Sequence, residues 1–249
     1  MSESIDIFEE NFRVMYSDVD FKGEIKAVKI LNLCQDIASR HTYKMGLSAL
    51  HMAKKEKIWV VHRYRLEFKK KLFWDEEFKI KTWRYPYKKL YEMRRFDFLD
   101  SKGELFVKGL CSWVLVDKKT KRPSRLDRAL EKDFCLECEK PEVFETDLKT
   151  LTNPVLTSDF RALRDDVDYN NHVNNTTYLK WAKECIEEND FNNKNLQKIE
   201  IVYANDCFYN DRIEVLSEKK DDNYITEYLM EIKKKRDNNL LSKVEIYLF

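Results

Sequence analysis

Glycine is scarce in this chain, and its scarcity excludes several classes of enzyme. Only four glycines occur among 249 residues, at Gly23, Gly46, Gly103 and Gly109. Walker-type phosphate loops, dinucleotide-binding glycine turns and the Gly-x-Ser-x-Gly elbow of many serine hydrolases all need closely spaced glycines. Nucleotide-binding enzymes of those kinds, and serine hydrolases with that elbow, are therefore excluded.

The chain also lacks a strong net charge and a long apolar run. Lysine and arginine total 46 and aspartate and glutamate 45, so the net charge is +1 although 37% of the residues are charged. No overall field attracts nucleic acid or a membrane surface. No stretch approaches the roughly 18–20 apolar residues of a membrane span, and the acidic N-terminus has no leader pattern. We expect a cytoplasmic protein without a membrane span or a nucleic-acid partner.

Cysteine shows no metal-binding arrangement. The six cysteines are scattered, and the one close pair, Cys135 and Cys138, has no second pair or histidine cluster at zinc spacing. We therefore expect reduced thiols, no metal site and no organic cofactor.

One sequence pattern occurs twice, 148 residues apart. In the first copy Phe12-Arg13 precede Asp18-Val19-Asp20-Phe21, and in the second copy Phe160-Arg161 precede Asp166-Val167-Asp168-Tyr169 with the same spacing. A histidine with an asparagine two residues before it occurs only in the second copy. Asn170 and His172 there correspond to Lys22 and Glu24 in the first copy. A second echo, in which Phe73-Trp74 precede Phe78 as Phe208-Tyr209 precede Ile213, places Lys71 opposite Asp206 at an offset of 135 residues.

Each copy is predicted to contain a leading strand, a long amphipathic helix and four further strands. The helices are expected over 28–43 and near 175–188, because apolar residues recur there at helical spacing. The strands are expected at 58–68, 78–85, 90–99 and 105–116, and at 199–203, 213–216, 224–232 and 240–248.

This order predicts an α+β fold, a tandem (double) hotdog in which each antiparallel sheet wraps around a central helix. We expect an N-terminal unit over 1–120, a connection over 121–152 with some helix near 126–132, and a C-terminal unit over 153–249. A single sheet shared by both units is the alternative.

Three polar side chains precede the second helix at alternate positions. If the segment is extended, Asp168, Asn170 and His172 lie on one side of it and converge. A helix N-terminus would add backbone N–H groups that stabilise a developing oxyanion. The competing interpretation is a purely structural helix cap and Asx turn.

The segment Asp168-x-Asn170-x-His172-Val173-Asn174-Asn175-x-x-Tyr178 resembles the signature of the acyl-acyl-carrier-protein thioesterases. These are double-hotdog enzymes that release fatty acids from their carrier. The resemblance extends to Thr82-Trp83, to Ser112-Trp113-x-Leu115-x-Asp117 and to Arg122-Pro123 in the first half. It implies hydrolysis of a fatty acyl thioester carried on the phosphopantetheine arm of an acidic acyl carrier protein.

The resemblance also implies a set of site residues. Asp168, Asn170 and His172 match residues assigned to the family's site, and Asp206 and Cys207 match an acidic residue and a cysteine on a following strand. Plant members have glutamate where Asp206 stands, so this side chain is shorter by one methylene. We expect Asp168 to act as general base or nucleophile, with Asn170 and His172 orienting it or the substrate. Cys207 as nucleophile, with His172 as base, is the alternative.

The resemblance also implies that the first unit holds the acyl chain, and the proposed lining is Ile30, Leu33, Ile37, Trp59 and Val60. Basic runs at 69–71, 118–122 and 233–236 are candidate contacts for the carrier. An acyl-CoA thioesterase, a non-catalytic acyl-binding hotdog protein and a hotdog dehydratase are the competing functions. A homodimer is retained as a hypothesis for the assembly.

Overall fold

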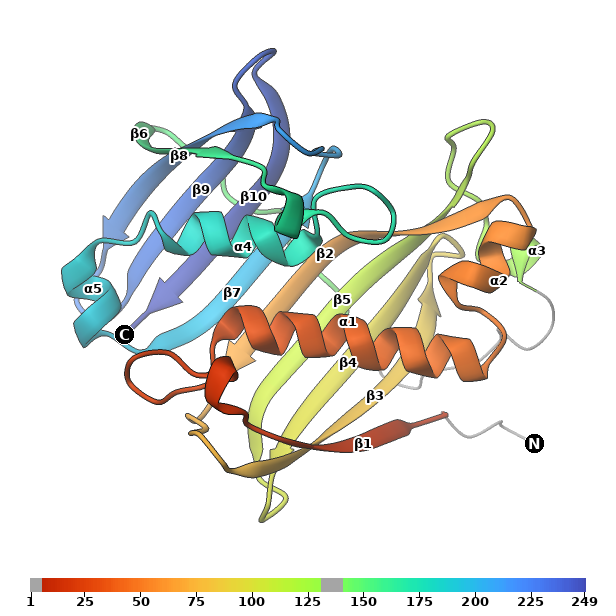
Figure 1. The fold of residues 1–249 in the computed structure, drawn as a ribbon, viewed down its shortest axis with the longest axis horizontal. Helices are drawn as coiled ribbons and strands as arrows, with labels where there is room; N and C mark the ends of the chain where they lie inside the picture. The colour runs from red at the N-terminus through yellow and green to blue at the C-terminus, as the bar shows by residue number, and fades with distance from the viewer. Residues whose placement is uncertain (1–5, 131–140) are drawn as a thin grey trace. The chain divides into compact units, whose positions relative to one another are not determined.

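A computed structural model describes residues 6–130 and 141–249 of the chain, which forms two compact units (Figure 1). Unit 1 comprises residues 1–145, and unit 2 comprises residues 146–249. The connection predicted over 121–152 is thus divided between the units at residue 145. Cys135, Cys138 and the end of the helix predicted near 126–132 lie outside the described residues.

Unit 1 contains an antiparallel sheet with the strand order β1-β3-β4-β5-β2. Alternate residues of the central strands point inward and are buried, as Phe78, Ile80, Phe96 and Phe98 show. The strands are β1 (Phe8–Arg13), β2 (Lys57–Phe68), β3 (Glu77–Tyr87), β4 (Tyr91–Asp100) and β5 (Leu105–Asp117).

Helix α1 (Ala27–Lys44) lies across the sheet of unit 1 (Figure 1). Its buried face includes Ile30, Leu33, Ile37 and His41, which recur at the three- and four-residue spacing of one helical face. Two short helices, α2 (Ala49–Lys54) and α3 (Leu126–Ala129), lie at one end of the unit. Their apolar side chains share a core cluster that contains Met52, Leu115, Leu126 and Leu130.

Unit 2 repeats this arrangement with the strand order β6-β8-β9-β10-β7. Helix α4 (Asn175–Lys183) lies across its sheet, and α5 (Glu188–Asn193) follows α4 (Figure 1). The strands are β6 (Val155–Arg161), β7 (Leu196–Tyr203), β8 (Arg212–Asp221), β9 (Thr226–Lys234) and β10 (Asn239–Leu248).

Both units are therefore hotdog units with the same order of elements, as the sequence predicted. The structure differs from the prediction in the short helices α2 and α5, which were not expected, in β8, which extends to Asp221 instead of residue 216, and in the second helix, which was expected to reach residue 188 but ends at Lys183. The amides of Cys185 and Ile186 donate to Ala182 and Lys183, three residues back. Such tightened bonds are typical of a helix end. Among the described residues, no helix combines the length and the apolar character needed to cross a bilayer.

Candidate active site

The segment that precedes α4 is a tight turn, whereas the sequence predicted an extended chain. The N–H of Asp168 donates to the carbonyl of His172 (2.8 Å), and the N–H of Asn171 donates to the carbonyl of Asp168 (3.0 Å). The carboxylate Oδ1 of Asp168 also accepts the amide of Asn170 (2.8 Å). Asn171 has a φ of +63°, a left-handed conformation that asparagine tolerates better than most residues. The extended segment was therefore a wrong expectation, because the Asp168 carboxylate stabilises a turn.

The turn places the predicted polar residues at different depths. Asp168 is partly buried, Asn170 is exposed at the tip, and the His172 side chain is 39% exposed. His172 Nδ1 lies 3.5 Å from Asp206 Oδ1, and the ring packs edge-on against Phe208 with 5.0 Å between ring centroids. That N–O distance suits an ion pair but is longer than a normal hydrogen bond. Catalytic contacts are often this loose before substrate binds.

Asp206 and Cys207 lie in the connection between β7 and β8, and not on a strand as expected. Strand β7 ends at Tyr203, and the amides of Ala204 and Asn205 then turn toward the carbonyl of Leu241. The chain leaves the strand direction there. The carbonyl of Cys207 accepts the N–H of Val173 (2.8 Å), which fixes this connection against the turn before α4.

The thiol of Cys207 is fully buried and lies beside a carboxylate. Burial, followed by the charge of Asp211, raises the pKa of the thiol to about 12. Asp211 also accepts the N–H of Phe208 (2.9 Å) and pairs with Lys234 (2.9 Å). These contacts favour a neutral thiol that anchors the connection, since a nucleophilic cysteine needs the thiolate.

The first amides of α4 are mostly engaged within the protein. The side chain of Asn174 accepts the N–H of Thr176 (2.9 Å), and its carbonyl accepts the N–H of Thr177 (2.9 Å). Among the described residues, none accepts a hydrogen bond from the N–H of Asn175. The sequence predicted that several amides of the helix start would stabilise an oxyanion. Of the first amides of α4 in the described chain, the one of Asn175 remains available as a donor.

Unit 1 contains the same turn without the same chemistry. The N–H of Asp20 donates to Glu24 (2.9 Å), that of Gly23 donates to Asp20 (3.0 Å), and Asp20 Oδ1 accepts the amide of Lys22 (2.9 Å). Gly23 has a φ of +76° at the position that corresponds to Asn171. The turn therefore forms independently of the reactive side chains.

The neighbouring connection is repeated as well. Lys71 pairs with Glu24 (2.6 Å) where unit 2 has its aspartate and histidine. The carbonyl of buried Leu72 accepts an amide of the turn, as that of Cys207 does. The sequence repeat thus corresponds to a repeated backbone framework, on which a lysine–glutamate pair in unit 1 stands where unit 2 has an aspartate–histidine pair.

The residues proposed to line an acyl slot fall into three environments. Ile30, Leu33 and Ile37 share the buried face of α1. Trp59 packs against the core cluster beside α2 and α3, and its indole N–H donates to the carbonyl of Leu47 (2.9 Å). Val60 is 40% exposed. The structure brings together the three α1 residues but not the two from β2.

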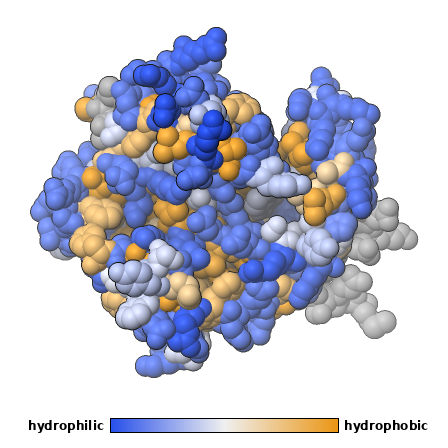
Figure 2. Space-filling model, in the orientation of Figure 1, coloured by the Kyte–Doolittle hydropathy of each residue, from blue (hydrophilic) through white to orange (hydrophobic). Residues whose placement is uncertain are grey.

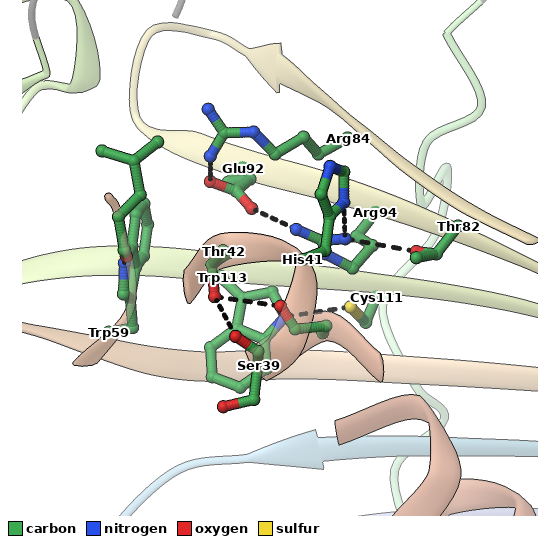
Figure 3. A network of polar contacts seen from close by, with 12 residues as sticks. Ser39, His41, Thr42, Trp59, Thr82, Arg84, Glu92, Arg94, Cys111 and Trp113 are labelled. Carbon is green, nitrogen blue, oxygen red and sulfur yellow. Dashed lines mark hydrogen bonds and ion pairs between the residues drawn. The ribbon is translucent and has the colours of Figure 1, made fainter. Parts of the chain in front are cut away.

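Sequence reasoning missed a buried polar network under α1 (Figure 3). Arg94 donates to His41 Nδ1 (3.0 Å) and to Thr82 (3.2 Å), and Glu92 accepts from Arg84 (2.9 Å) and pairs with Arg94 (3.4 Å). Burial and then the Arg94 charge lower the pKa of His41, which favours a neutral ring. The network ties α1 to β3 and β4.

Comparison with known proteins matches both halves of the chain. The acyl-ACP thioesterase N-terminal domain matches residues 5–134, and the C-terminal domain of the same family matches residues 151–247. The oleoyl-acyl carrier protein thioesterase 2 of Arabidopsis thaliana is 26% identical over 89% of this chain and 65% of its own length. Two further curated oleoyl-acyl carrier protein thioesterases match over 63% and 62% of their length, so the chain spans less than two thirds of these relatives.

Solved structures share the fold. An acyl-ACP thioesterase from Bacteroides thetaiotaomicron has a TM-score of 0.86 at 19% identity, with 98% of each chain covered. A 12:0-ACP thioesterase from Umbellularia californica has a TM-score of 0.81 at 17% identity, covering 98% of this chain and 94% of its own.

Proposed function

Since the chain belongs to the acyl-ACP thioesterase family, we propose that it hydrolyses the thioester of a fatty acyl-acyl carrier protein. Water adds to the thioester carbonyl, the C–S bond breaks, and the products are a free fatty acid and the carrier with its thiol restored. The observation that carries the proposal is the replacement of a Lys71–Glu24 ion pair by the Asp206–His172 pair on a shared framework.

The roles follow from the position of each group. Asp168 accepts a proton from the attacking water, because its Oδ2 receives no hydrogen bond from the described residues. His172, beside Asp206, orients the water or protonates the leaving thiol, and exposed Asn170 contacts the thioester. The Asn175 amide is the oxyanion donor, a type of contact that contributes about 10²–10³ in rate.

A different assignment makes Asp168 the nucleophile, with a mixed anhydride as intermediate. Hydrolysis in water enriched in ¹⁸O separates the two routes. A general base gives fatty acid labelled from the solvent and leaves the protein unlabelled. Attack by the carboxylate gives a mixed anhydride, and water that opens it at the Asp168 carbonyl carbon leaves ¹⁸O in Asp168. Water that opens it at the acyl carbon labels only the fatty acid, so that case is tested by trapping the acyl-enzyme with hydroxylamine.

The test of the function is thiol release from acyl carrier protein by purified wild-type protein and two matched variants. Asp168→Asn keeps an oxygen that can accept the Asn170 amide but cannot act as base, so kcat should fall by about 10²–10⁴. Asp20→Asn makes the same change in the equivalent turn of unit 1, and kcat should stay within about twofold. Near-normal turnover by Asp168→Asn would remove Asp168 from the mechanism, and no turnover by wild type would reject the function.

A further inference from the structure

Positive charge is concentrated at one end of unit 1. Residues 54–57, 88–89 and 117–128 together contain eleven lysines and arginines but only three carboxylates, a surplus of eight. The whole chain has a net charge of +1, so all its other residues together have a net charge of −7. We call these three segments the basic end of unit 1.

Hydrogen bonds hold the three segments together. The N–H of Lys118 donates to the carbonyl of Glu56 (2.9 Å), and the N–H of Leu126 donates to the carbonyl of Lys89 (2.9 Å). The core cluster of α2, α3 and β5 lies beneath them and makes this end a fixed surface. The space-filling view shows mainly hydrophilic side chains around the loop that follows β5 (Figure 2).

In the described part of the chain, most of these cations form no ion pair with a carboxylate. Ten of the eleven are exposed, and three are in ion pairs. The other eight, which include Lys118, Lys121 and Arg122, form no ion pair with any carboxylate in the described part of the chain. The three pairs are Lys57–Asp117 (2.7 Å), Lys119–Glu56 (2.8 Å) and Arg125–Asp127 (2.6 Å).

In the other two basic runs, nearby carboxylates neutralise the lysines. This difference distinguishes the three runs, which the sequence offered as equal candidates for contact with the carrier. In the run 69–71 every lysine pairs with a carboxylate. In the run 233–236 the three lysines pair with Glu231, Asp211 and Asp159, each at 2.9 Å. Only the run 118–122 belongs to a surface with a large surplus of charge.

We propose that the basic end of unit 1 is the surface on which a small acidic carrier protein docks. This inference rests on the proposed function, which supplies the acidic partner. Complementary charge would accelerate encounter and fix the orientation of the carrier. A long polyanion such as nucleic acid fits less well, because the remaining surface has the opposite sign and repels it.

Two double variants that remove the same charge test the docking surface. Lys118→Gln with Lys121→Gln removes two charges from the basic end, and Lys233→Gln with Lys235→Gln removes two from the neutralised run. Each is assayed with fatty acyl carrier protein and with the same acyl group on N-acetylcysteamine, which has no protein part. We expect the first variant to raise KM for the carrier substrate by about fivefold or more at low salt. The second should change it by less than twofold, and neither should change kcat/KM for the small thioester.

Binding measured without catalysis makes the test independent of the proposed function. Fluorescence anisotropy of labelled acyl carrier protein should show weaker binding to the first variant than to the second, and weaker binding of wild type as salt rises. If wild type hydrolyses neither thioester but this difference persists, the function fails and the docking surface stands. Equal effects of both variants, no effect of either, or tighter binding of an oligonucleotide or of phosphatidylglycerol vesicles than of the carrier would overturn the docking proposal.

Discussion

At the scale of single residues, structural and chemical roles overlap in the proposed site. Asp168 stabilises its turn as Asp20 does in a unit without the reactive set. Both interpretations of this residue, as cap and as base, are therefore compatible with the geometry. For Cys207 the burial of its thiol and the neighbouring Asp211 favour the structural role alone.

We predict that Cys207→Ala keeps most of the activity. With the thiol pKa near 12, roughly one thiol in ten thousand is ionised at pH 8, too few to sustain nucleophilic catalysis. The variant should keep kcat within about threefold of wild type and lose about 1 kcal/mol of unfolding free energy through lost packing. Native protein treated with iodoacetamide should stay active. Complete loss of turnover in a folded Cys207→Ala protein would establish the thiolate route.

The sequence was enough to name candidate site residues, but their geometry could not be predicted from it. The spacing of Asp168, Asn170 and His172 and the family resemblance indicated the set and its place before a helix. The alternation of these polar residues suggested an extended chain. The Asp168 carboxylate instead accepts a backbone N–H and stabilises a turn, which the alternation does not indicate. The position of Asp206 opposite His172 depends on where β7 ends, which is a tertiary effect.

At the scale of elements, one buried carboxylate connects α5 to two strands of its unit. Asp190 accepts a hydrogen bond from the Tyr228 hydroxyl (2.7 Å) and pairs with Lys194 (2.9 Å) and Lys219 (2.8 Å). Burial alone would raise the pKa of Asp190, but the hydrogen bonds from Lys219, Tyr228 and Lys194 outweigh it and lower the pKa to about 2. The short helix therefore depends on a charged contact with β8 and β9.

We predict that this contact gives unit 2 a specific acid sensitivity. Because the folded pKa of Asp190 is below its unfolded value of about 3.9, the stabilisation is complete above pH 4 and disappears between about pH 4 and pH 2. Asp190→Asn should lose about 2 kcal/mol of unfolding free energy at pH 7 and lack that part of the acid dependence. Urea unfolding at several pH values measures both effects. Exposed Asp165→Asn, with the same charge change, should stay within about 0.5 kcal/mol of wild type, and an equal loss in both would refute the assignment.

The two buried arginines under α1 follow the two-residue periodicity of their strands. Arg84 and Arg94 have the same parity as the inward-facing Phe78 and Phe96 on their strands, so alternation alone places them inside. Their charge argued for the surface instead. Burial is tolerated here because Glu92, His41 and Thr82 supply partners. Glu92 and Thr82 come from the same two strands, and His41 comes from α1.

At the scale of the whole molecule, the two units share one plan but differ in what they carry. Strand order, turn and connection are the same in both. The His172–Asp206 pair belongs to unit 2, and the surplus of positive charge belongs to unit 1. We propose that unit 1 also holds the acyl chain, as the sequence suggested.

We predict that shortening Ile37 changes chain-length preference without removing activity. Ile37 is fully buried on α1, and Ile37→Val opens space at a cost of about 0.5–1.5 kcal/mol. The ratio of kcat/KM values across acyl carrier substrates of increasing length should shift toward longer chains. The matched control is Cys185→Ala, at the equivalent position 148 residues later, which should lower stability and leave the ratio unchanged. An unchanged ratio in Ile37→Val, or equal shifts in both variants, would reject the location.

The repeated turn has a consequence for how such a molecule can change over time. The same backbone hydrogen bonds form in both units although the side chains differ. One unit has lysine, glutamate and leucine where the other has asparagine, histidine and cysteine. Asp20 and Asp168 therefore stabilise the same turn in both units, and the residues at the neighbouring positions distinguish the unit that is proposed to be reactive. Activity could be gained or lost in one half through a few substitutions, with the architecture of both halves preserved throughout.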